Sequence, residues 1–494
     1  MIIKINGDIN RYYVQTLCMI YYPGAKFTDI PEDDGTPELE VSLVHEDTCC
    51  SATAVATIDG KSYTAVKKNE YTDYHTPERS AKIAVGDAVA TVLGEIVSYK
   101  PSWGILTGVR PSKVASEYLG MGMSKTRVKK LLNTDYLVIP KKASLATEVA
   151  LTEKKIIGVP DKKDCSMYIS IPFCPSRCSY CSFVSYSSKK LLSLVPEYLE
   201  RLKRDVAETC KLINRLGLNL KTVYIGGGTP TILSERELSE LLTTIDEHID
   251  VDKLEEYTLE AGRPDTITAE KFEIARAHGI TRVSVNPQSL CPEVLSSIGR
   301  HHSADDFYRA YNIAVKSGIK YINTDLIIGL PGDNFKRFSA TFDEILSLDP
   351  ANITVHTFCV KKSADILKNG SDVYSMRGGD AGKCVDYSQI KSSQAGYIPY
   401  YMYRQKKTVG NFENVGFAKP GAEGIYNIHM MEETHSILAV GAGAVTKLVK
   451  ISDGHEKTKI SRLFNQKYPY EYLSDNKTDE MLKEVERFYT EEVL

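Results

Sequence analysis

The chain has 494 residues, of which 42% are hydrophobic and 25% charged, and its formal net charge is -3. This composition is typical of a globular protein with two or three domains. It excludes an overall basic bias towards nucleic acid, and the sequence shows no evident internal repeat or low-complexity tract.

The N-terminus and the cysteines bear on the cellular compartment. The opening MIIKINGDINRYYV becomes polar too early for a signal peptide, and no later apolar run approaches the length of a membrane span. The eleven cysteines are an odd number, spread thinly along the chain. We therefore expect a cytoplasmic protein without a membrane span, in which a clustered subset of cysteines serves a metal or a reaction rather than disulfides.

Residues 1 to about 97 have a mixed pattern that predicts a small α/β domain. A helical stretch from Ile9 to Tyr21 and another from Arg79 to Val97 flank the strand-like segments ELEVSLV and SATAVATI. Pro111 is well placed to begin a helix, and a helical region follows to about Val159. We assign residues 1–160 to this N-terminal α/β and helical accessory region.

Two features of the helical region leave alternatives open. The segment SKTRVKKLLNTDYL carries Lys125, Arg127, Lys129 and Lys130, which form either a solvated face or a contact surface for phosphates or tetrapyrrole carboxylates. Arg110 is either a carboxylate clamp or one half of an ion pair at the helix start.

From Cys165 onward, short strand-like runs alternate with amphipathic helices, which is typical of an α/β fold with a parallel sheet. The helices include Val195 to Leu216 and Ala304 to Ser317, and the six runs are SMYISI, TVYIGG, EYTLEA, RVSVNP, YINTDLIIG and NITVHTF. Six units are too few for a closed eight-stranded barrel. We predict a partial, open (β/α)6 barrel over residues 161–360.

Unusual residues follow four of these strands. Gly226 to Pro230 come after VYI, Glu260 ends YTLE, Gln288 follows VSVNP, and Asp325 follows YINT. Because the loops at the carboxyl ends of parallel strands line the site of such barrels, we expect these residues to converge on one rim. Beyond residue 360 the repetition stops, and we predict a mainly helical cap domain over residues 361–494 that covers the open barrel.

The stretch YISIPFCPSRCSYCSF holds Cys174, Cys178 and Cys181 in the spacing C-x3-C-x2-C. A zinc site would need a fourth ligand from a second C-x2-C or a histidine pair nearby, whereas His301 and His302 lie far along the chain at an expected helix start. Three thiolates on a cubane iron–sulfur cluster leave one iron without a protein ligand, and that iron can bind a reactive group. We expect the other cysteines to be small buried hydrophobes: Cys18, Cys49, Cys50, Cys165, Cys210, Cys291, Cys359 and Cys384.

This cysteine stretch resembles the signature of radical S-adenosylmethionine (SAM) enzymes, and in particular the oxygen-independent coproporphyrinogen III oxidase family, whose members share Y-I-x-I-P-F-C before the cluster. IGGGTPT, RVSVNPQSL and DLIIGLPG are similar to that family as well, so the resemblance is strong over about residues 165–358. SILAVGAGAV resembles it more weakly. GILTGVRPSKV and YRQKKTVGNFENVG resemble the HemZ-type coproporphyrinogen dehydrogenase branch.

The resemblance implies that Cys174, Cys178 and Cys181 ligate a [4Fe-4S] cluster, whose fourth iron binds the amino and carboxylate groups of SAM. It places Tyr168 beside the cluster and SAM. Contacts with one or two SAM molecules are further implied for Gly227, Gly228, Thr229, Glu260, Gln288, Arg300 and Asp325, with Ile327 packing near the adenosyl group.

The implied reaction is the oxidative decarboxylation of coproporphyrinogen III to protoporphyrinogen IX in haem biosynthesis. An unidentified reductant such as flavodoxin or ferredoxin would supply the electron that splits SAM, and the resulting radical would take a hydrogen from a propionate side chain. Loss of carbon dioxide and one electron would then leave a vinyl group. Two rounds of this reaction would convert two propionate side chains.

One position departs from the family's pattern. Classical members carry another cysteine two places after the third, where this chain has Phe183, as in the related haem-chaperone branch. A haem-binding or haem-delivery protein that retains the cluster and the SAM site is therefore an alternative. A radical SAM enzyme acting on another tetrapyrrole, or on RNA through the face from Lys125 to Lys130, is a further one.

Overall fold

The computed structural model describes residues 1–30, 36–108, 110–359, 379–405, 408–451 and 458–493. The chain divides into two compact units, Met1–Thr152 with Met402–Lys406, and Glu153–Tyr401 with Lys407–Leu494. The predicted boundary near residue 160 lies close to the end of the main segment of the first unit, whereas the predicted boundary near residue 360 lies outside the described residues.

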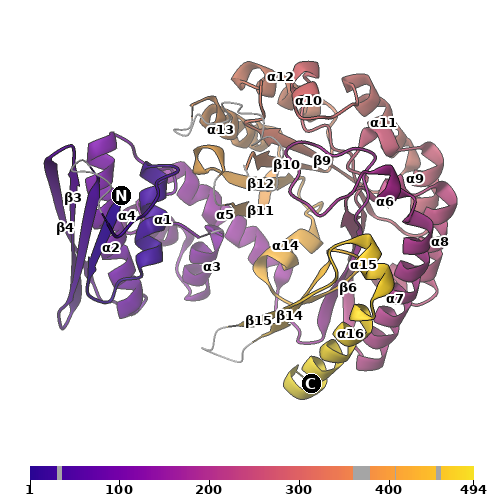
Figure 1. The fold of residues 1–494 in the computed structure, drawn as a ribbon, viewed down its shortest axis with the longest axis horizontal. Helices are drawn as coiled ribbons and strands as arrows, with labels where there is room; N and C mark the ends of the chain where they lie inside the picture. Colours follow the sequence, from indigo (N-terminus) through magenta and orange to yellow (C-terminus); the bar gives the residue numbers. More distant parts are fainter. Residues whose placement is uncertain (31–35, 109, 360–378, 406–407, 452–457, 494) are drawn as a thin grey trace. The chain divides into compact units, whose positions relative to one another are not determined.

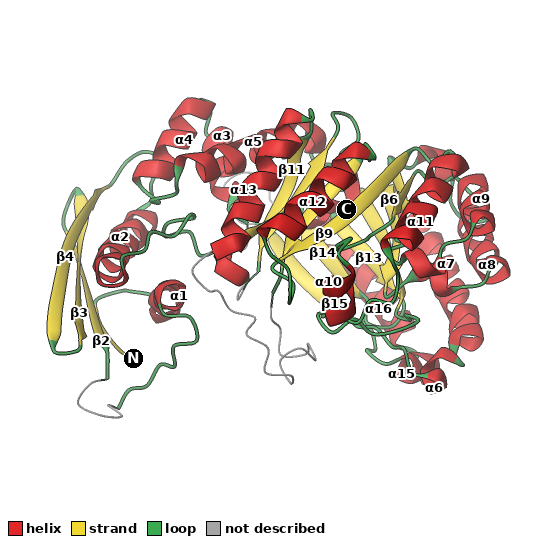
Figure 2. Ribbon diagram, turned by 90° about the horizontal axis from the view of Figure 1, so that it is seen from above, coloured by secondary structure: helices red, strands yellow, loops and turns green. Residues whose placement is uncertain are grey.

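The first unit is built on a four-stranded sheet in the order β1-β2-β3-β4 (Figure 1). The strands are β1 (Ile2–Asn6), β2 (Glu38–His45), β3 (Cys49–Ile58) and β4 (Lys61–Glu70), and all neighbours except the parallel pair β1 and β2 are antiparallel. Helices α1 (Arg11–Tyr21) and α2 (Pro77–Val97) lie on the same side of this sheet (Figure 2). Both helices and the strands β2 and β3 confirm the sequence pattern. The mostly polar strand β4 was not predicted; it pairs with β3 along its length as the edge strand of the sheet, so the N–H and C=O groups that face β3 are satisfied.

Three helices follow in the accessory region, α3 (Ser112–Gly120), α4 (Lys125–Thr134) and α5 (Pro140–Ile157). Pro111 immediately precedes α3 with helical dihedral angles, as predicted. Lys125 and Lys130 of α4 are exposed, and the guanidinium of Arg127 lies 5.2 Å from the centre of the Tyr74 ring. These placements favour the solvated-face interpretation of the basic residues.

The second unit contains an eleven-stranded sheet whose order is β11-β12-β10-β9-β8-β7-β6-β5-β13-β14-β15. Its six central strands are parallel to one another and correspond one by one to the six predicted runs. They are β5 (Asp164–Ile171), β6 (Asn219–Gly227), β7 (Glu256–Leu259), β8 (Arg282–Ser284), β9 (Tyr321–Ile328) and β10 (Asn352–Thr357). The strand order is open at both ends, which confirms the partial barrel.

Helices cover the outer side of these strands (Figure 1). Two of them, α7 (Val195–Leu216) and α11 (Ala304–Ser317), have the predicted bounds. The others are α6 (Lys189–Leu192), α8 (Glu235–Asp246), α9 (Ala269–Ala277), α10 (Pro292–Ser297) and α12 (Phe335–Ser347). The amphipathic spacing of α7 buries Tyr198, Leu202 and Val206 on one face, which is the pattern expected for a helix that covers a sheet.

The C-terminal region contains the expected helices and also extends the sheet at both edges. Its helices are α13 (Gly379–Gln394), α14 (Ile425–Glu432), α15 (Pro469–Ser474) and α16 (Lys477–Phe488). Its strands are β11 (Ile398–Arg404), β12 (Glu413–Ala418), β13 (Ser436–Val440), β14 (Val445–Lys450) and β15 (Lys459–Phe464). Strand β13 pairs in parallel with β5, and β12 pairs antiparallel with β10. The sequence pattern did not predict these strands.

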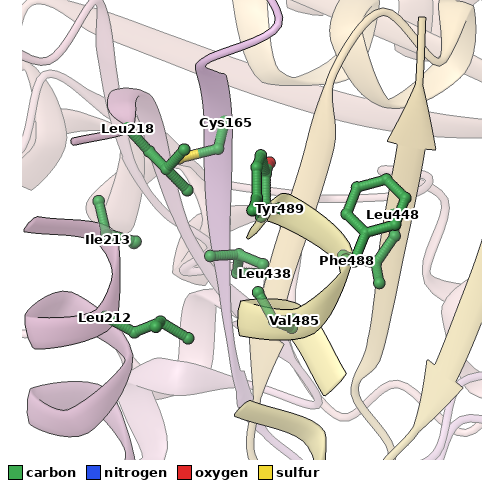
Figure 3. Close-up of a cluster of buried hydrophobic side chains, with 9 residues drawn as sticks. All are labelled: Cys165, Leu212, Ile213, Leu218, Leu438, Leu448, Val485, Phe488 and Tyr489. Atoms are coloured by element: carbon green, nitrogen blue, oxygen red, sulfur yellow. The ribbon is translucent and has the colours of Figure 1, made fainter. Parts of the chain in front are cut away.

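A hydrophobic cluster joins this C-terminal extension to the barrel strands (Figure 3). It brings Cys165 of β5 together with Leu438 of β13, Leu448 of β14 and Phe488 of α16. Cys165 is fully buried there, as expected for a cysteine that acts as a small hydrophobe. Of the other cysteines outside the motif, Cys18, Cys50, Cys210 and Cys384 are buried, and Cys49, Cys291 and Cys359 are half-buried.

None of the described helices combines the length and the apolar character that crossing a membrane requires.

Candidate active site

The three motif cysteines lie on the loop between β5 and α6, which we call the cysteine loop (residues 172–188). Cys174 and Cys178 are buried and Cys181 is half-buried. The Sγ atom of Cys174 lies 3.3 Å from Thr229 Oγ1, and that of Cys181 lies 4.0 Å from Ser185 Oγ. Burial raises the pKa of the Cys174 and Cys181 thiols, and the proximity of the three sulfurs raises it further.

The arrangement of these cysteines fits a cluster better than a single ion. In the described part of the chain, no group of three His, Cys, Asp or Glu side chains is placed to hold one metal ion. A cubane cluster does not need such convergence, because each cysteine sulfur ligates a different iron. Binding to iron would also keep the thiols deprotonated despite their burial, since a coordinating thiol loses its proton.

Arg263 binds the cysteine loop through hydrogen bonds, and the sequence did not predict this role. Its Nη1 donates to Ser176 Oγ at 2.9 Å and lies 3.9 Å from Cys178 Sγ. Asp265 accepts two hydrogen bonds from the same guanidinium, at 2.9 and 2.8 Å. Arg263 is only 3% exposed, so its charge acts on the cysteine loop with little screening by water. It is 85 positions away from Cys178, and no local pattern signals this contact.

The glycines after β6 let the chain run directly against the cysteine loop. The N–H of Gly228 donates to the carbonyl of Ile171 at 2.8 Å, and that of Thr229 donates to the carbonyl of Phe173 at 2.8 Å. A Cβ added at Gly228 would lie 2.6 Å from the Phe173 carbonyl oxygen, and Gly227 has a φ of 114°. Both glycines are therefore needed by this packing. Their predicted contact with SAM remains a prediction.

Two carboxylates of the site differ in charge state: Glu260 directly follows β7, whereas Asp325, which we expected after its strand, lies within β9. Burial, and then the charge of Asp325, raises the pKa of Glu260 to about 8. Burial alone would raise the pKa of Asp325, but His356, whose Nε2 lies 3.8 Å from Oδ2, and a hydrogen bond from Asn323 outweigh it and hold that pKa below its usual value. The Nδ2 atoms of Asn286 and Asn323 both donate to Asp325, each at 2.8 Å. At neutral pH the unliganded site therefore contains an ionised Asp325 and a protonated Glu260.

Tyr168 lies beside the carboxylates in a stack of three tyrosines. Its ring centre is 6.0 Å from that of Tyr224 and 6.4 Å from that of Tyr426, and the last two rings are 4.6 Å apart. Burial, and then the charge of Glu260, holds the pKa of Tyr168 and Tyr224 well above the usual value. Tyr426 belongs to α14, so the C-terminal region contributes to the site at a position that the sequence did not indicate.

Gln288 and Arg300 each leave a buried polar atom without a partner among the described residues. Gln288 has a φ of 64°, and its backbone bonds to Asp325 and Ile327 of β9, while its Oε1 has no partner. Arg300 donates to the carbonyls of Gly262 and Asn286 and to the hydroxyl of Tyr180, but its Nε has no partner. Because an unpaired buried polar atom costs about 1–3 kcal/mol, these atoms indicate a polar ligand.

The structure thus brings most of the predicted site residues together. Arg300 links the cysteine loop, through Tyr180, to the Asn286 that binds Asp325. Ile327 packs in an apolar cluster with Leu330, Phe358 and their neighbours, against which Tyr180 also packs. His301 is exposed, whereas His302 is buried near Arg300, and burial lowers its pKa to about 4. Arg110 and the basic face of α4 belong to the first unit and are not assigned to this site.

The Radical SAM superfamily pattern matches residues 168–345. The oxygen-independent coproporphyrinogen-III oxidase-like protein HemZ of Bacillus subtilis is 35% identical over 448 residues, which cover 88% of each chain. The heme chaperone HemW of the same organism is 29% identical over 65% of this chain and 81% of its own.

Among solved structures, the coproporphyrinogen III oxidase HemN of Escherichia coli superposes with a TM-score of 0.51 and covers 67% of this chain and 72% of its own. Only 20% of the aligned residues are identical, so this similarity shows the fold and no more. It agrees with the open parallel sheet described above.

Proposed function

Because the chain belongs to the radical SAM superfamily, in the family of the coproporphyrinogen-III oxidase-like protein HemZ, we propose that it decarboxylates coproporphyrinogen III oxidatively to protoporphyrinogen IX. Membership of this superfamily implies a [4Fe-4S] cluster and SAM as cofactors. The observation that supports the proposal most is the position of the three motif cysteines, two buried and one half-buried, beside a site with unpaired polar atoms and two carboxylates. The substrate is inferred from the HemZ relative, an oxygen-independent coproporphyrinogen-III oxidase-like protein that matches 88% of this chain.

In this proposal Cys174, Cys178 and Cys181 hold the cluster, and the carboxyl rim of β6 to β9 holds SAM. When bound, the two cofactors supply the radical that removes a propionate β-hydrogen, and loss of carbon dioxide and one electron then leaves a vinyl group. Glu260, protonated in the unliganded site, would ionise when the cationic SAM binds, because a nearby positive charge favours the carboxylate. Asp325 is already ionised and held by two asparagines, so it would accept hydrogen bonds from a ligand without a change in charge.

Other residues would orient the ligand and exclude water. The unpaired Nε of Arg300 and Oε1 of Gln288 would gain partners only when a polar ligand is present. The stacked rings of Tyr168, Tyr224 and Tyr426 form an aromatic wall beside Glu260, which keeps water from the carboxylate.

The test is turnover by the anaerobically reconstituted protein. Incubation with coproporphyrinogen III, SAM and a reductant should yield divinyl product, carbon dioxide, methionine and 5'-deoxyadenosine, with two SAM molecules consumed per protoporphyrinogen IX. The Cys178→Ala variant should lose iron and SAM cleavage together. SAM cleavage without any substrate-dependent vinyl product would contradict the proposed reaction.

A haem-binding or haem-delivery protein is the second candidate, favoured by a specific observation at Phe183. The heme chaperone HemW relatives match up to 65% of this chain, and Phe183 lies two residues after Cys181 with 68% of its surface exposed. A side chain there is accessible to a flat apolar ligand. Titration with haem distinguishes the two functions. Stoichiometric haem binding that is weakened in the Phe183→Ala variant, together with the absence of vinyl product, would support the second function.

A further inference from the structure

The exposed aromatic side chains of this protein gather beside the cysteine loop. The described residues include five exposed aromatics, and only Tyr12 belongs to the first unit. The other four are Phe183 on the cysteine loop, Phe464 at the end of β15, Tyr468 at the start of α15 and Tyr470 within α15. Exposed aromatic clusters of this kind are typical of interaction sites, because aromatic residues are enriched in interface cores.

Ring contacts and a hydrogen bond join the cysteine loop to the start of α15. The Tyr186 and Tyr468 rings are 5.6 Å apart, the Tyr468 and Tyr470 rings are 5.4 Å apart, and the hydroxyl of Tyr186 donates to the carbonyl of Lys467. Figures 1 and 2 both place α6, which ends the cysteine loop, near α15. We call the set Phe183, Tyr186, Tyr468 and Tyr470 the aromatic patch.

The aromatic patch is directly connected to a proposed cluster ligand. The backbone N–H of Cys174 donates to the carbonyl of Tyr186 at 3.0 Å, and Phe183 follows Cys181 by two residues. A protein docked on this patch would therefore lie close to the proposed cluster, because Tyr186 bonds to Cys174 and Phe183 is two residues from Cys181.

The charge around the patch is positive, against a net charge of -3 for the whole chain. Lys189, Lys190 and Lys467 are exposed, and among the described residues none of them forms an ion pair with a carboxylate. The ammonium of Lys467 lies 5.8 Å from the centre of the Tyr468 ring. Glu471 of α15 is half-buried, and its carboxylate accepts a hydrogen bond from the backbone N–H of Tyr468. A cationic rim around exposed aromatics attracts a partner with a negative face.

We propose that the aromatic patch and its three lysines are the docking site of an acidic one-electron carrier protein that reduces the cluster. This inference rests on the proposed radical SAM function and names a partner for that site. In each transfer the carrier is oxidised by one electron and the cluster is reduced by one electron, and no atoms are exchanged. Such complexes are small and transient, and charge governs their rate of association more than their affinity.

The experiment measures cluster reduction without substrate, so that it does not depend on porphyrinogen turnover. Photoreduced flavodoxin, an acidic carrier, is mixed with the anaerobically reconstituted protein, and the cluster absorbance is followed by stopped flow at several salt concentrations. The triple variant Lys189→Glu/Lys190→Glu/Lys467→Glu should reduce the second-order rate constant at least tenfold at low salt, with a flatter salt dependence. The variant Tyr470→Ser should lower the rate constant without changing the salt dependence.

Two controls separate docking from damage to the cluster. Dithionite should reduce the wild-type protein and every variant to the same EPR signal, because this small reductant needs no docking surface. The matched variant Lys61→Glu/Lys316→Glu/Lys336→Glu removes three exposed lysines elsewhere and should keep the wild-type rate constant. Wild-type rate constants in the patch triple variant, at every salt concentration, would overturn the proposal. The proposal would also be overturned if the wild-type protein formed a dimer and the patch variants became monomers without slower reduction. In that case a second copy of this chain, and not an electron carrier, would occupy the aromatic patch.

Discussion

At the scale of single residues, the site buries two carboxylates whose charges are compensated unequally. Glu260 has a pKa of about 8 and Asp325 a lowered one, although the two carboxylates belong to the same rim. Asp325 has two asparagine donors, whereas the main influences on Glu260 are burial and the negative charge of Asp325 itself. A cationic ligand would relieve both effects on Glu260.

We therefore expect Glu260→Gln to stabilise the unliganded protein at alkaline pH and to weaken SAM binding. The folded pKa of Glu260 lies above the unfolded one, so the free energy of unfolding falls as pH rises from about 4.5 towards 8. Gln removes this loss, so the melting temperature of the variant should exceed that of the wild type at pH 8.5 and approach it at pH 5. SAM affinity, measured by equilibrium dialysis, should fall about tenfold, since one charged hydrogen bond contributes roughly 1.5–3 kcal/mol. Identical pH profiles for both proteins would contradict this role, and the exposed Glu270→Gln serves as a control.

Arg263 is the second residue whose effect is measurable by itself. Its positive charge, 3.9 Å from Cys178 Sγ, should stabilise the reduced, more negative cluster. Arg263→Gln should shift the midpoint potential to a more negative value in an EPR-monitored redox titration and lower the iron content by loosening Ser176. Arg309→Gln, at a position where the side chain is 73% exposed, should change neither quantity. An unchanged potential in a fully loaded Arg263→Gln protein would show that this guanidinium has no electrostatic effect on the cluster.

At the scale of elements, the end of β6 and the cysteine loop form one packed unit. Backbone hydrogen bonds from Gly228 and Thr229 to Ile171 and Phe173 join them, and the hydroxyl of Thr229 reaches Cys174. The conformation of the cysteine loop therefore depends on its own sequence and also on glycine at positions 227 and 228, where a side chain would meet the loop or the end of β5.

Gly228→Ala tests this dependence. The added methyl group would lie 2.6 Å from the Phe173 carbonyl oxygen, so either the loop or the strand end must shift. We expect a loss of about 1–3 kcal/mol in the free energy of unfolding and a reduced iron and sulfide content after reconstitution. Gly120→Ala is the matched control, because a Cβ there meets no atom within 4 Å. Normal iron loading in Gly228→Ala would mean that the loop tolerates displacement.

At the scale of the whole second unit, a buried ionic network ties the C-terminal region to the barrel. The Nε of Arg282 on β8 donates to Glu256 of β7 at 3.0 Å, its Nη1 donates to Asn352 of β10, and its Nη2 donates to the carbonyls of Ala422 and Glu423 at 3.0 Å. The carboxylate of Glu256 also accepts the first two N–H groups of α14, the helix that carries Tyr426. The N-terminal end of that helix stabilises the negative charge.

Arg282→Met should therefore destabilise the protein by about 3–5 kcal/mol, because it leaves the Glu256 carboxylate buried with one partner fewer. Urea unfolding measures this loss. Adding Glu256→Gln should recover part of the stability, since the remaining buried charge is then removed. The exposed Arg309→Met should stay within about 0.5 kcal/mol of the wild type. A small effect of Arg282→Met alone would show that water reaches this network.

The sequence by itself determined the features that depend on local pattern. Apolar alternation and helical periodicity predicted the six parallel strands and the bounds of α7 and α11, because these elements bury one regular face against neighbours that follow in order. The three cysteines and the residues at the strand ends were also visible, since a parallel sheet brings successive carboxyl ends to one edge.

Only the tertiary structure decided what depends on contacts between distant segments. β13 pairs with β5 and Tyr426 completes the tyrosine stack across more than 200 positions, while Arg263 reaches Cys178 across 85. The charge states of Glu260 and Asp325 likewise follow from burial and from partners on other strands. A pKa or a hydrogen bond of this kind is a property of the space around a side chain, and neighbours along the chain do not specify that space.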